Sequence, residues 1–429
     1  MKKVLAVVIM LVLMFSFVAC NKNSQEAQNT PVEQVTGDEL SGTIVIWSWD
    51  VAAKALEEAG ENFKKLHPNV EFQIEDLGND QVYDKLTTRL ASNTGLPDVV
   101  TVEGERVSTF VSKFPKGFAD LTEVVNSKDF LPVKMAECRV NDKIFAYPWD
   151  GAPCGLFYRA DLFENAKINP DEIVTWEDFI EAGKKMNSIG VKIMPLAASK
   201  NTNMYGILLN QLGTYYFDKD GNTVVNSDES LKAMSIVKKM YDSGITYDNV
   251  NWDGLVTASK EGKIATVPTA VWWAGTLQDE CTETSGKWRV MKLPVIEKGL
   301  DYAAVSGGSN IMIPEAAENK KAAIEFAKFA MTDIESQING FRKYGLYPSY
   351  IPSYDDPVFE EEVGYFGGQK IWRFFTEIGK NIPELNYTEN FDEASDNVRD
   401  AQARILLKKA DIAETMNTLQ TTLVDKFGK

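Results

Sequence analysis

The hydrophobic and polar positions follow two alternating periods at the start of the globular part of the chain. Residues 42–49 are β-branched or aromatic with almost no polar interruption and no charge, which predicts a buried strand. After Asp50, apolar residues recur at spacings of three and four, which predicts an amphipathic helix; they are Val51, Ala55, Ala59, Phe63 and Leu66. Pro68 ends that helix, and the alternation over 70–74 predicts a second strand.

The same order then continues along the chain. Val82, Leu86 and Leu90 mark one face of a second helix, and residues 98–103 read as a third strand. Strand–helix–strand order predicts parallel pairing with helices on the faces of the sheet, which is an α/β fold. Because ligands bind at the carboxyl ends of such strands, residues 47–50 and 103–106 are the first candidates for a binding site.

The second half of the chain has similar helix and turn signals, but its sequence does not repeat that of the first half. Thr175 to Asp178 is typical of a capped helix start. Residues 218–222 resemble the start of a calcium loop, but they lack its downstream glutamate, so we interpret them as a hairpin turn. Apolar spacing predicts one helix that ends at Gly244 and mostly helical chain from Asp396 onward.

The amino end decides the compartment. Lys2 and Lys3 precede an apolar run over 4–18, which has the length of a signal-peptide core and is short for a bilayer-spanning helix. Ala19 and Cys20 follow and resemble the bacterial lipobox, in which the cysteine is acylated, although Phe17 replaces the usual leucine. We therefore expect a signal peptide at 1–19 and lipidation at Cys20; an ordinary secretory signal with a chance cysteine is the alternative.

The segment 20–41 is polar, with almost no large apolar side chains. Such a composition cannot offset the entropy of ordering, so we expect a lipid-anchored, flexible tether. No later apolar run is long enough to span a bilayer. The sequence thus predicts an exported protein that is tied to the cell membrane, on its extracellular face or periplasmic side.

Composition limits the function further. The length of 429 residues predicts two domains after the tether, and the net charge is −17. A strongly acidic body excludes nucleic acid as a partner and argues against broad contact with anionic lipid, because both need a positive surface. Repulsion between acidic copies keeps such a protein soluble, and we expect a monomer.

The cysteine and histidine content argues against most hydrolytic chemistry. Cys138, Cys154 and Cys281 have no metal-ligand spacing, and we expect three buried or isolated thiols rather than a disulfide. His67 is the only histidine, so a histidine-based zinc site or a catalytic triad would have to use it. We predict no catalytic residue, no metal site and no cofactor.

Several motifs in a fixed order resemble the extracellular solute-binding proteins of ABC importers, the family that includes maltose-type sugar-binding lipoproteins. The segments that carry the resemblance, along nearly the whole mature chain, are GTIVIWSWD at 42–50, LPDVVTVEGE at 96–105, KIFAYPWDGAPCGLFYRADLF at 143–163, TWEDF at 175–179, EGKIATVPTAVWWAGTL at 261–277, GGSNIMIP at 307–314, AAIEFAKFAMTDIESQ at 322–337 and YGLYPS at 344–349. Arg159 stands where asparagine is common in the family.

The resemblance implies a two-lobed, periplasmic-binding-protein-like α/β fold of class II, with the ligand in a cleft between the lobes. We expect an N-lobe at 42–148 and 304–346 and a C-lobe at 149–303 and 347–429. The implied function is solute transport: a substrate-binding lipoprotein, not an enzyme, that hands a mono- or oligosaccharide to the permease subunits of an ABC transporter.

A sugar has a face of C–H groups and a rim of hydroxyls, so its site needs flat aromatic rings beside polar side chains. Candidates of both kinds stand at predicted loop positions or in the family segments. They are Trp49, Asp50, Glu103, Trp149, Asp150, Trp273, Ser309, Asn310, Arg342, Tyr347 and Trp372, with Glu105 beside Glu103.

Each candidate also has a packing interpretation. Core packing and ligand stacking remain open for Trp47 and Trp372. Alternation indicates that one of Trp272 and Trp273 faces the core and the other the ligand, and we choose Trp273 for the ligand. Gly307 and Gly308 are typical of positive φ or of close backbone approach.

Three alternatives to a sugar-binding transport protein stay open. An exported glycosidase could use paired carboxylates such as Asp50, Glu103 and Asp150. The same fold could instead bind a polyamine, glycerol phosphate or a metal chelate. A structural adhesin would show no closure on ligand. The abundance of tryptophan favours the sugar.

Overall fold

The computed structural model describes residues 40–248, 251–300 and 303–428 of the chain. The expected signal peptide at 1–19, the lipidation site Cys20 and nearly all of the tether lie outside these residues. Within them, no helix is both long enough and apolar enough to cross a membrane.

The elements that surround the first hydrophobic core include a five-stranded sheet in the order β2-β1-β3-β12-β6. Its strands are β1 Gly42–Ser48, β2 Val70–Asp76, β3 Val99–Glu103, β6 Ala146–Pro148 and β12 Ser309–Met312. β1 pairs in parallel with both β2 and β3, as the sequence predicts. β12 is antiparallel to β3 and β6, so a segment from late in the chain completes the early sheet.

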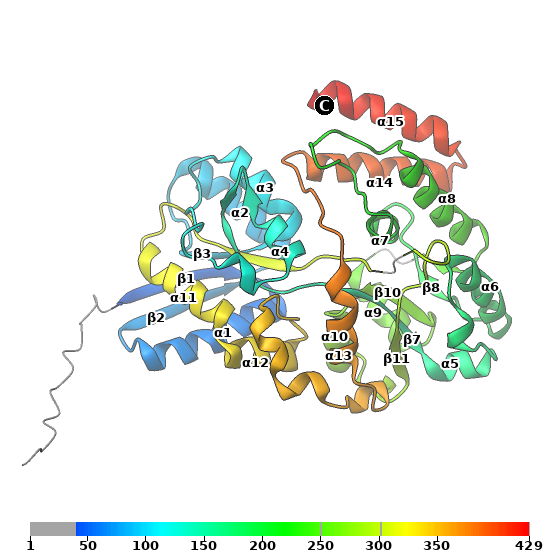
Figure 1. Ribbon diagram of the computed structural model, residues 1–429, viewed down its shortest axis with the longest axis horizontal. Coiled ribbons are helices and arrows are strands. Elements are labelled where there is room, and N and C mark those ends of the chain that lie inside the picture. The colour runs from blue at the N-terminus through cyan, green and yellow to red at the C-terminus, as the bar shows by residue number, and fades with distance from the viewer. Residues whose placement is uncertain (1–39, 249–250, 301–302, 429) are drawn as a thin grey trace, which may run out of the picture. The chain divides into compact units, whose positions relative to one another are not determined.

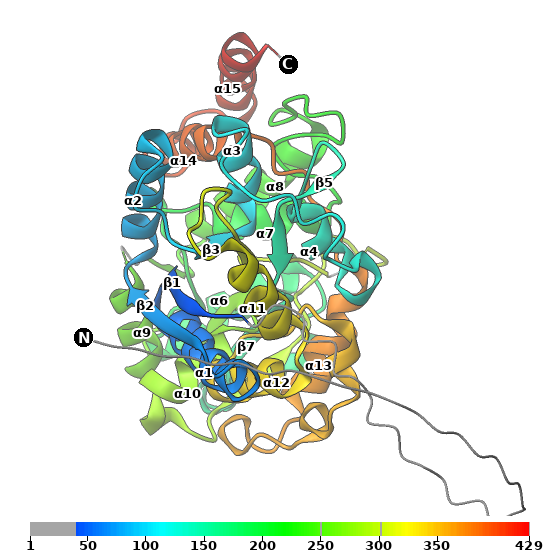
Figure 2. The same ribbon diagram turned by 90° about the vertical axis from the view of Figure 1, so that its left-hand side faces the viewer.

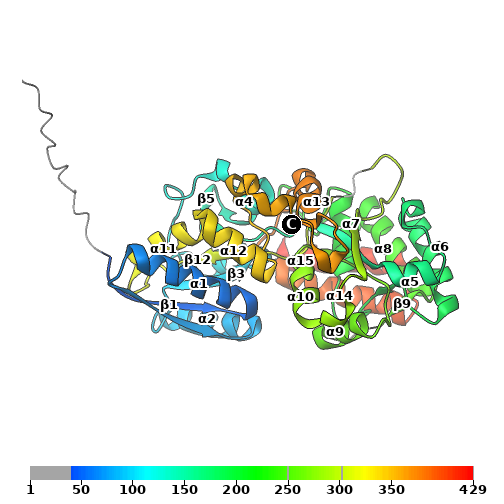
Figure 3. The same ribbon diagram turned by 90° about the horizontal axis from the view of Figure 1, so that it is seen from below.

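Helices cover this sheet, as Figure 1 and Figure 3 show. They are α1 Asp50–Leu66, α2 Asn79–Ser92, α3 Gly104–Lys113, α4 Pro132–Glu137 and α11 Lys320–Thr332. The predicted face of α1 buries Ala55, Ala59 and Phe63, whereas Leu66 is 63% exposed at the end of the helix. All three predicted positions of α2 are buried.

The second hydrophobic core has a smaller, antiparallel sheet in the order β10-β7-β11. Its strands are β7 Cys154–Arg159, β10 Thr266–Ala270 and β11 Trp288–Met291. Two further pairs of two-residue strands are β4 Arg139–Val140 with β5 Lys143–Ile144, and β8 Met194–Pro195 with β9 Thr246–Tyr247. Both pairs in the three-stranded sheet are antiparallel, whereas the first sheet combines parallel and antiparallel pairs, and the sequence pattern did not indicate this difference.

Most of the remaining helices pack on this second core. They are α5 Ala160–Asn165, α6 Trp176–Met186, α7 Asn203–Gln211, α8 Asp228–Asp242, α9 Trp252–Lys260, α10 Trp273–Glu280, α12 Ile334–Tyr344, α13 Ile371–Ile378, α14 Phe391–Leu407 and α15 Ile412–Phe427. Thr175 and Asp178 form the predicted capping box of α6. Residues 218–222 form the predicted hairpin turn, with Asp218 Oδ1 accepting from the backbone N–H of Asn222 at 2.8 Å.

Short 3-10 helices connect these elements. They are η1 Ser127–Asp129, η2 Pro170–Glu172, η3 Asn187–Ile189, η4 Thr282–Thr284, η5 Ile351–Asp355, η6 Pro357–Glu360, η7 Gly364–Phe366 and η8 Gly379–Asn381. The three cysteines of the described chain are free and buried, as expected, and burial raises the pKa of Cys281 to about 11.

Three segments run side by side where the chain passes between the two cores. Gly151 N–H donates to the Tyr347 carbonyl oxygen at 2.7 Å, and Ser349 N–H donates to that of Trp149 at 2.8 Å. The third segment joins through Cys154 N–H, which donates to the Ala304 carbonyl at 2.8 Å. The segments therefore form one hydrogen-bonded hinge. Helix α12 packs along α1 and also places Ile338 and Phe341 in the second core, and the exact lobe boundaries stay a prediction.

Candidate functional site

A small cavity of about 120 Å³ lies between the two lobes. The first lobe supplies Glu105 from the amino end of α3, whose Val107 and Phe110 are packed in the first core. The hinge segment 305–307 forms another wall. The second lobe supplies the rest of the lining: Thr202, Asn203, Gly206, Ile207, Tyr215, Tyr216, Tyr387, Phe391 and Ser395.

Four aromatic rings form the second-lobe wall of this cavity. Phe391 stacks nearly parallel on Tyr215 and Tyr216, with ring centroids 5.7 Å and 5.4 Å apart. Tyr387 meets the edge of Phe391 at 4.7 Å. The Tyr216 hydroxyl lies 2.9 Å from Thr202 Oγ1. The wall thus combines flat ring faces with hydroxyl groups that are positioned by neighbours.

Gly206 on α7 makes room for this wall. A Cβ at that position would lie 2.6 Å from the Tyr215 hydroxyl oxygen, closer than any ordinary contact. Burial raises the pKa of Tyr215 well above its usual value, helped by the nearby Tyr216 and Glu105. Its hydroxyl therefore keeps its proton at neutral pH and can donate a hydrogen bond.

Glu105 is the one carboxylic acid among the described residues that line the cavity. Burial raises the pKa of its carboxyl to about 8, and the negative charges of Glu103 and Glu137 add to the effect more strongly than Arg106 opposes it. A carboxyl with this pKa is mostly protonated at pH 7. It then offers a ligand one O–H donor and one acceptor, and no charge.

A larger cavity of about 350 Å³ adjoins the small one on the second lobe. The half-buried Trp272 and the exposed Trp252 line it, with ring centroids 5.9 Å apart. Asn203 lines both cavities. The Trp272 indole N–H donates to the Ser306 carbonyl oxygen at 3.0 Å, and Ser306 lines the small cavity. The two cavities are therefore neighbouring compartments with a shared wall.

A buried polar cluster lies at the hinge beside these compartments. Asp150 is 4% exposed, and its Oδ1 accepts a hydrogen bond from Ser309 N–H at 2.5 Å. Lys134, which is fully buried, forms an ion pair with Glu137. Burial would lower the pKa of Lys134, but Glu137 and Asp150 outweigh it and raise that pKa. Burial raises the pKa of Asp150 to about 6, although Lys134 opposes the shift.

Both hinge glycines have the backbone that the sequence indicates, with φ of +76° at Gly307 and +104° at Gly308. A Cβ at Gly308 would lie 2.7 Å from the Asp150 carbonyl oxygen and 3.0 Å from Lys134 Nζ. A side chain at this position would therefore separate two hinge segments.

Some predicted site residues lie on the first lobe near the cleft. Trp49 is half-buried and meets the edge of Tyr83 at 5.8 Å. Asp50 is exposed at the start of α1, and its N–H donates to Asp76 Oδ1 at 2.8 Å. Glu103 is half-buried, and its Oε2 accepts from the Tyr83 hydroxyl at 2.8 Å. These three do not line either compartment in this structure, and their contact with a ligand stays a prediction.

Other predicted residues are placed differently from the expectation. Trp273 is fully buried between Trp252 and the second core, whereas Trp272 is the one of the pair that lines a cavity, so the structure favours Trp272 for contact with a ligand. Tyr347 and Trp372 are 1% and 3% exposed and pack around Phe341. Both rings belong to the second core, and neither lines either compartment.

The predicted polar site residues also lie in two different places. Arg342 is an exposed residue whose Nη2 lies 2.7 Å from Glu361 Oε1, and it lines neither compartment. Trp149, Asp150, Ser309 and Asn310 belong to the hinge and its buried cluster, where Asn310 Nδ2 donates to Glu137 Oε2 at 3.4 Å. They hold the hinge together rather than face the compartments.

The residues that sequence reasoning missed come from the second lobe. Tyr215 and Tyr216 were interpreted only as flanks of a hairpin turn, and Tyr387 and Phe391 precede or begin a helix that reads as polar. Asn203 begins α7 after a loop of ordinary composition. The one sequence feature that could have indicated these residues is the density of aromatic residues at 215–217 and 387–391.

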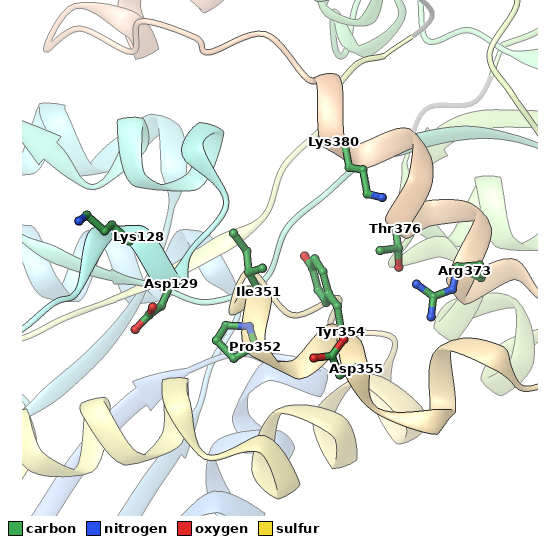
Figure 4. Close-up of a pocket in the computed structure, with 9 residues that line it drawn as sticks. All are labelled: Lys128, Asp129, Ile351, Pro352, Tyr354, Asp355, Arg373, Thr376 and Lys380. Atoms are coloured by element: carbon green, nitrogen blue, oxygen red, sulfur yellow. The ribbon is translucent and has the colours of Figure 1, made fainter.

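A third hollow, of about 460 Å³, is lined by residues of η1, η5 and α13 and by Lys380, and is drawn in Figure 4. Its lining is mainly charged: Lys128, Asp129, Asp355, Arg373 and Lys380. Tyr354 is its one aromatic residue, and the Tyr354 hydroxyl donates to the Pro348 carbonyl oxygen at 2.7 Å. This hollow lacks the pairs of open ring faces that mark the other two compartments.

The two lobes, their crossing hinge and the cavity between them define a two-lobed binding protein of the periplasmic type. The chain belongs to the family of bacterial extracellular solute-binding proteins, whose model matches residues 48–335. The members of this family are binding proteins. Within the described residues, no group of three or more histidine, cysteine or acidic side chains is placed to hold a metal ion.

Several characterised proteins are similar to this chain over most of its length. A lactose-binding protein of Rhizobium radiobacter is 27% identical over 391 residues, which cover 89% of this chain and 92% of that protein. An arabinooligosaccharide-binding protein of Bacillus subtilis is 24% identical and covers 85% and 87%. The fold matches an ABC transporter associated binding protein of B. animalis, solved with β-1,6-galactobiose, at a TM-score of 0.77 with 21% identity, over 90% of this chain and 97% of that one.

Proposed function

We propose that this protein captures an uncharged carbohydrate of two or more sugar rings between its lobes and delivers it to an ABC permease. The observation that carries the proposal is the pair of adjoining compartments, lined by aromatic and polar side chains, with Glu105 as the one acid among the described lining residues. The names of the relatives, which bind lactose and arabinooligosaccharides, support the same ligand class.

The chemistry of the walls suits a sugar. In the small compartment, Thr202 and Ser395 supply hydroxyl groups to the rim of one pyranose, and Tyr215 and Tyr387 border it with aromatic side chains. Trp272 and Trp252 provide an apolar surface for the C–H face of a following ring. The large compartment, at 350 Å³, is within the range of about 300–1,000 Å³ that small-molecule sites occupy, whereas the small one alone is below it.

The same lining disfavours the other ligands. A polyamine needs ionised carboxylates, and the raised pKa of Glu105 leaves the small compartment without one at neutral pH. Glycerol phosphate needs cations, and Lys200 at the larger compartment is the single lysine or arginine among the described lining residues. A glycosidase needs two carboxyl groups on either side of the scissile bond, and the lining supplies one.

The transport role rests on family membership together with the sequence of residues 1–41. A leader peptide, an acylated Cys20 and a polar tether would hold the binding lobes outside the cell at the membrane that carries the permease. Closure of the lobes on a bound sugar would then present a surface that differs from the empty form.

A thermal-shift screen tests the proposal. The panel contains glucose, galactose, lactose, maltose, β-1,6-galactobiose, maltotriose and arabinotriose, with spermidine and glycerol 3-phosphate as rival ligands. A ligand that binds only the folded state raises the Tm by mass action. We expect a rise with at least one di- or trisaccharide. A rise with spermidine or glycerol phosphate alone, or release of reducing sugar from the oligosaccharides, would contradict the proposal.

A further inference from the structure

Arg106 of α3 does not line the small cavity, but its side chain forms a contact between the two lobes. Its Nη1 lies 2.9 Å from Asp392 Oδ2 on α14, across a sequence separation of 286 residues. The two side chains are 33% and 34% exposed, so water screens the pair only in part. One turn further along α3, Thr109 Oγ1 donates to the Glu389 carbonyl oxygen at 3.4 Å. Helices α3 and α14 lie close together near the top of Figure 2.

The same guanidinium has a second acceptor within its own lobe. Arg106 Nε lies 4.0 Å from Glu103 Oε2, which is beyond hydrogen-bonding distance. That Nε is buried and has no hydrogen-bond partner among the described residues. The guanidinium also lies over the ring of Tyr83, 4.6 Å from its centroid. A buried donor without a partner is unfavourable, so a small movement toward Glu103 would gain a hydrogen bond once Asp392 is released.

Formation of the pair and completion of the small cavity are geometrically linked. Glu105, the neighbour of Arg106 on α3, lines that cavity, and so does Phe391, the neighbour of Asp392 on α14. Because each helix moves as a rigid unit, Arg106 can reach Asp392 only when these two cavity walls face each other. Separation of the lobes would break the ion pair and open the cavity in one step.

We propose that Arg106 is a positioning residue that exchanges Asp392 for Glu103 when the lobes separate. With Asp392, it stabilises the arrangement in which the cavity is complete, and with Glu103 it stabilises the separated arrangement. Since a ligand that bridges the lobes binds the first arrangement better, the strength of the Arg106–Asp392 pair sets part of the affinity for sugar. This inference rests on the proposed function.

Calorimetric titration of the full chain with lactose, or with the tightest-binding disaccharide of the panel, tests the closing contact. Asp392→Asn is expected to raise the Kd by roughly two- to fivefold, the range of a partly exposed ion pair. Arg106→Gln is expected to raise the Kd by less, because it removes the contact with Glu103 in the separated arrangement as well. The double variant is expected to bind as Arg106→Gln does, because Asp392 has no partner in the other lobe once Arg106 is replaced. Strictly additive losses would overturn the proposal, and so would an unchanged affinity in Asp392→Asn.

Asp396→Asn is the matched control. Asp396 lies one turn further along α14, and its Oδ1 pairs with Arg399 of the same helix at 2.9 Å, so the change removes the same charge without touching the other lobe. The control is expected to bind as the wild type does. If the pair only stabilised the fold, Asp392→Asn would lower the Tm of the ligand-free protein and leave the Kd unchanged. Absence of heat with every sugar would contradict the proposed function instead.

The exchange of partners has its own spectroscopic test. The ¹H–¹⁵N resonance of Arg106 Nε, assigned by its loss in Arg106→Lys, reports the partner of that N–H directly. We expect this resonance to shift when lactose, or the tightest disaccharide, is added, because Glu103 accepts from Nε only in the separated arrangement. A resonance at the same position before and after saturation would overturn the exchange.

Discussion

Trp272 and Ser306 are joined by a hydrogen bond of 3.0 Å from the indole N–H to the backbone carbonyl oxygen. The bond fixes a tryptophan ring against a hinge segment, and the same segment forms a wall of the small compartment. The ring itself lines the large compartment. One side chain thus stands where a ligand would pass from the first sugar position to the second.

Replacement of Trp272 by alanine is expected to weaken binding at the second sugar position and to leave the first position nearly unchanged. The variant should bind a disaccharide more weakly by about 1–2 kcal/mol, the worth of a lost stacking ring with its apolar area. Binding of a monosaccharide that occupies the small compartment should change much less. Calorimetry with lactose and with galactose measures both, and an equal loss for the two sugars would contradict the assignment of Trp272 to a second position.

The neighbouring Trp273 should behave in the opposite way. It is fully buried, and its indole N–H has no hydrogen-bond partner among the described residues. Trp273→Ala is expected to lower the free energy of unfolding by about 3–5 kcal/mol through the cavity it leaves. Trp273→Phe keeps a ring and should lose clearly less. Urea unfolding measures both, and a stable alanine variant with weakened sugar binding would restore Trp273 as a ligand residue.

Glu105 predicts a dependence of stability on pH. Its pKa of about 8 in the folded protein exceeds the ordinary value of 4.5, so the folded state holds this proton more tightly than the unfolded state. The contribution of Glu105 to stability is therefore complete below about pH 4.5 and is lost as the pH rises through 8. Glu105→Gln should flatten the fall in Tm between pH 5 and 8.

Two comparisons control that experiment. Glu335→Gln removes one exposed carboxyl from α12 and should leave the slope of the wild type. Glu105→Gln should also retain sugar binding at pH 7, because an amide and a protonated carboxyl both donate and accept hydrogen bonds. If the slope of Tm against pH were the same in Glu105→Gln and the wild type, the neutral-acid interpretation would be refuted.

The buried pair of Lys134 and Glu137 predicts a pattern of coupling. Lys134→Met leaves the carboxyl of Glu137 buried without its cation, and the free energy of unfolding should fall by about 3–5 kcal/mol. The double change Lys134→Met, Glu137→Leu should recover part of this loss, because the carboxyl that pairs with Lys134 is removed together with it and only Asp150 still loses a nearby cation. Chemical unfolding of the single and double variants measures the recovery. A double variant less stable than Lys134→Met would contradict the pairing.

The sequence predicts the first lobe well because its elements are regular. The apolar spacing of α1 and α2 and the uncharged run of β1 determine a parallel sheet almost without reference to the rest of the chain. What it does not predict is the insertion of β12, from residue 309 onward, between β3 and β6. Pairing over such distances depends on tertiary contacts rather than on a local pattern.

The site is harder to predict, for a physical reason. The sequence does not distinguish a tryptophan or tyrosine that packs in a core from one that lines a cavity. Only the exposure of the side chain differs, as it does between Trp272 and Trp273. Trp149 and Asp150 were predicted to lie at the lobe crossing and to bind the ligand, and in the structure the carboxyl of Asp150 accepts a hydrogen bond from the backbone N–H of Ser309. The second-lobe wall is assembled from Tyr215, Tyr387 and Phe391, which no sequence spacing brings together.

We propose that two adjoining compartments, the small one between the lobes and the large one on the second lobe, hold one uncharged sugar of at least two rings. Calorimetric titration of the protein with galactose, lactose and spermidine, repeated with Trp272→Ala, tests it most directly. We expect one bound lactose per chain, weaker or absent heat with galactose, none with spermidine, and a selective loss of lactose affinity in the variant. Equal affinity for galactose and lactose in the wild type, or tight binding of spermidine, would contradict it.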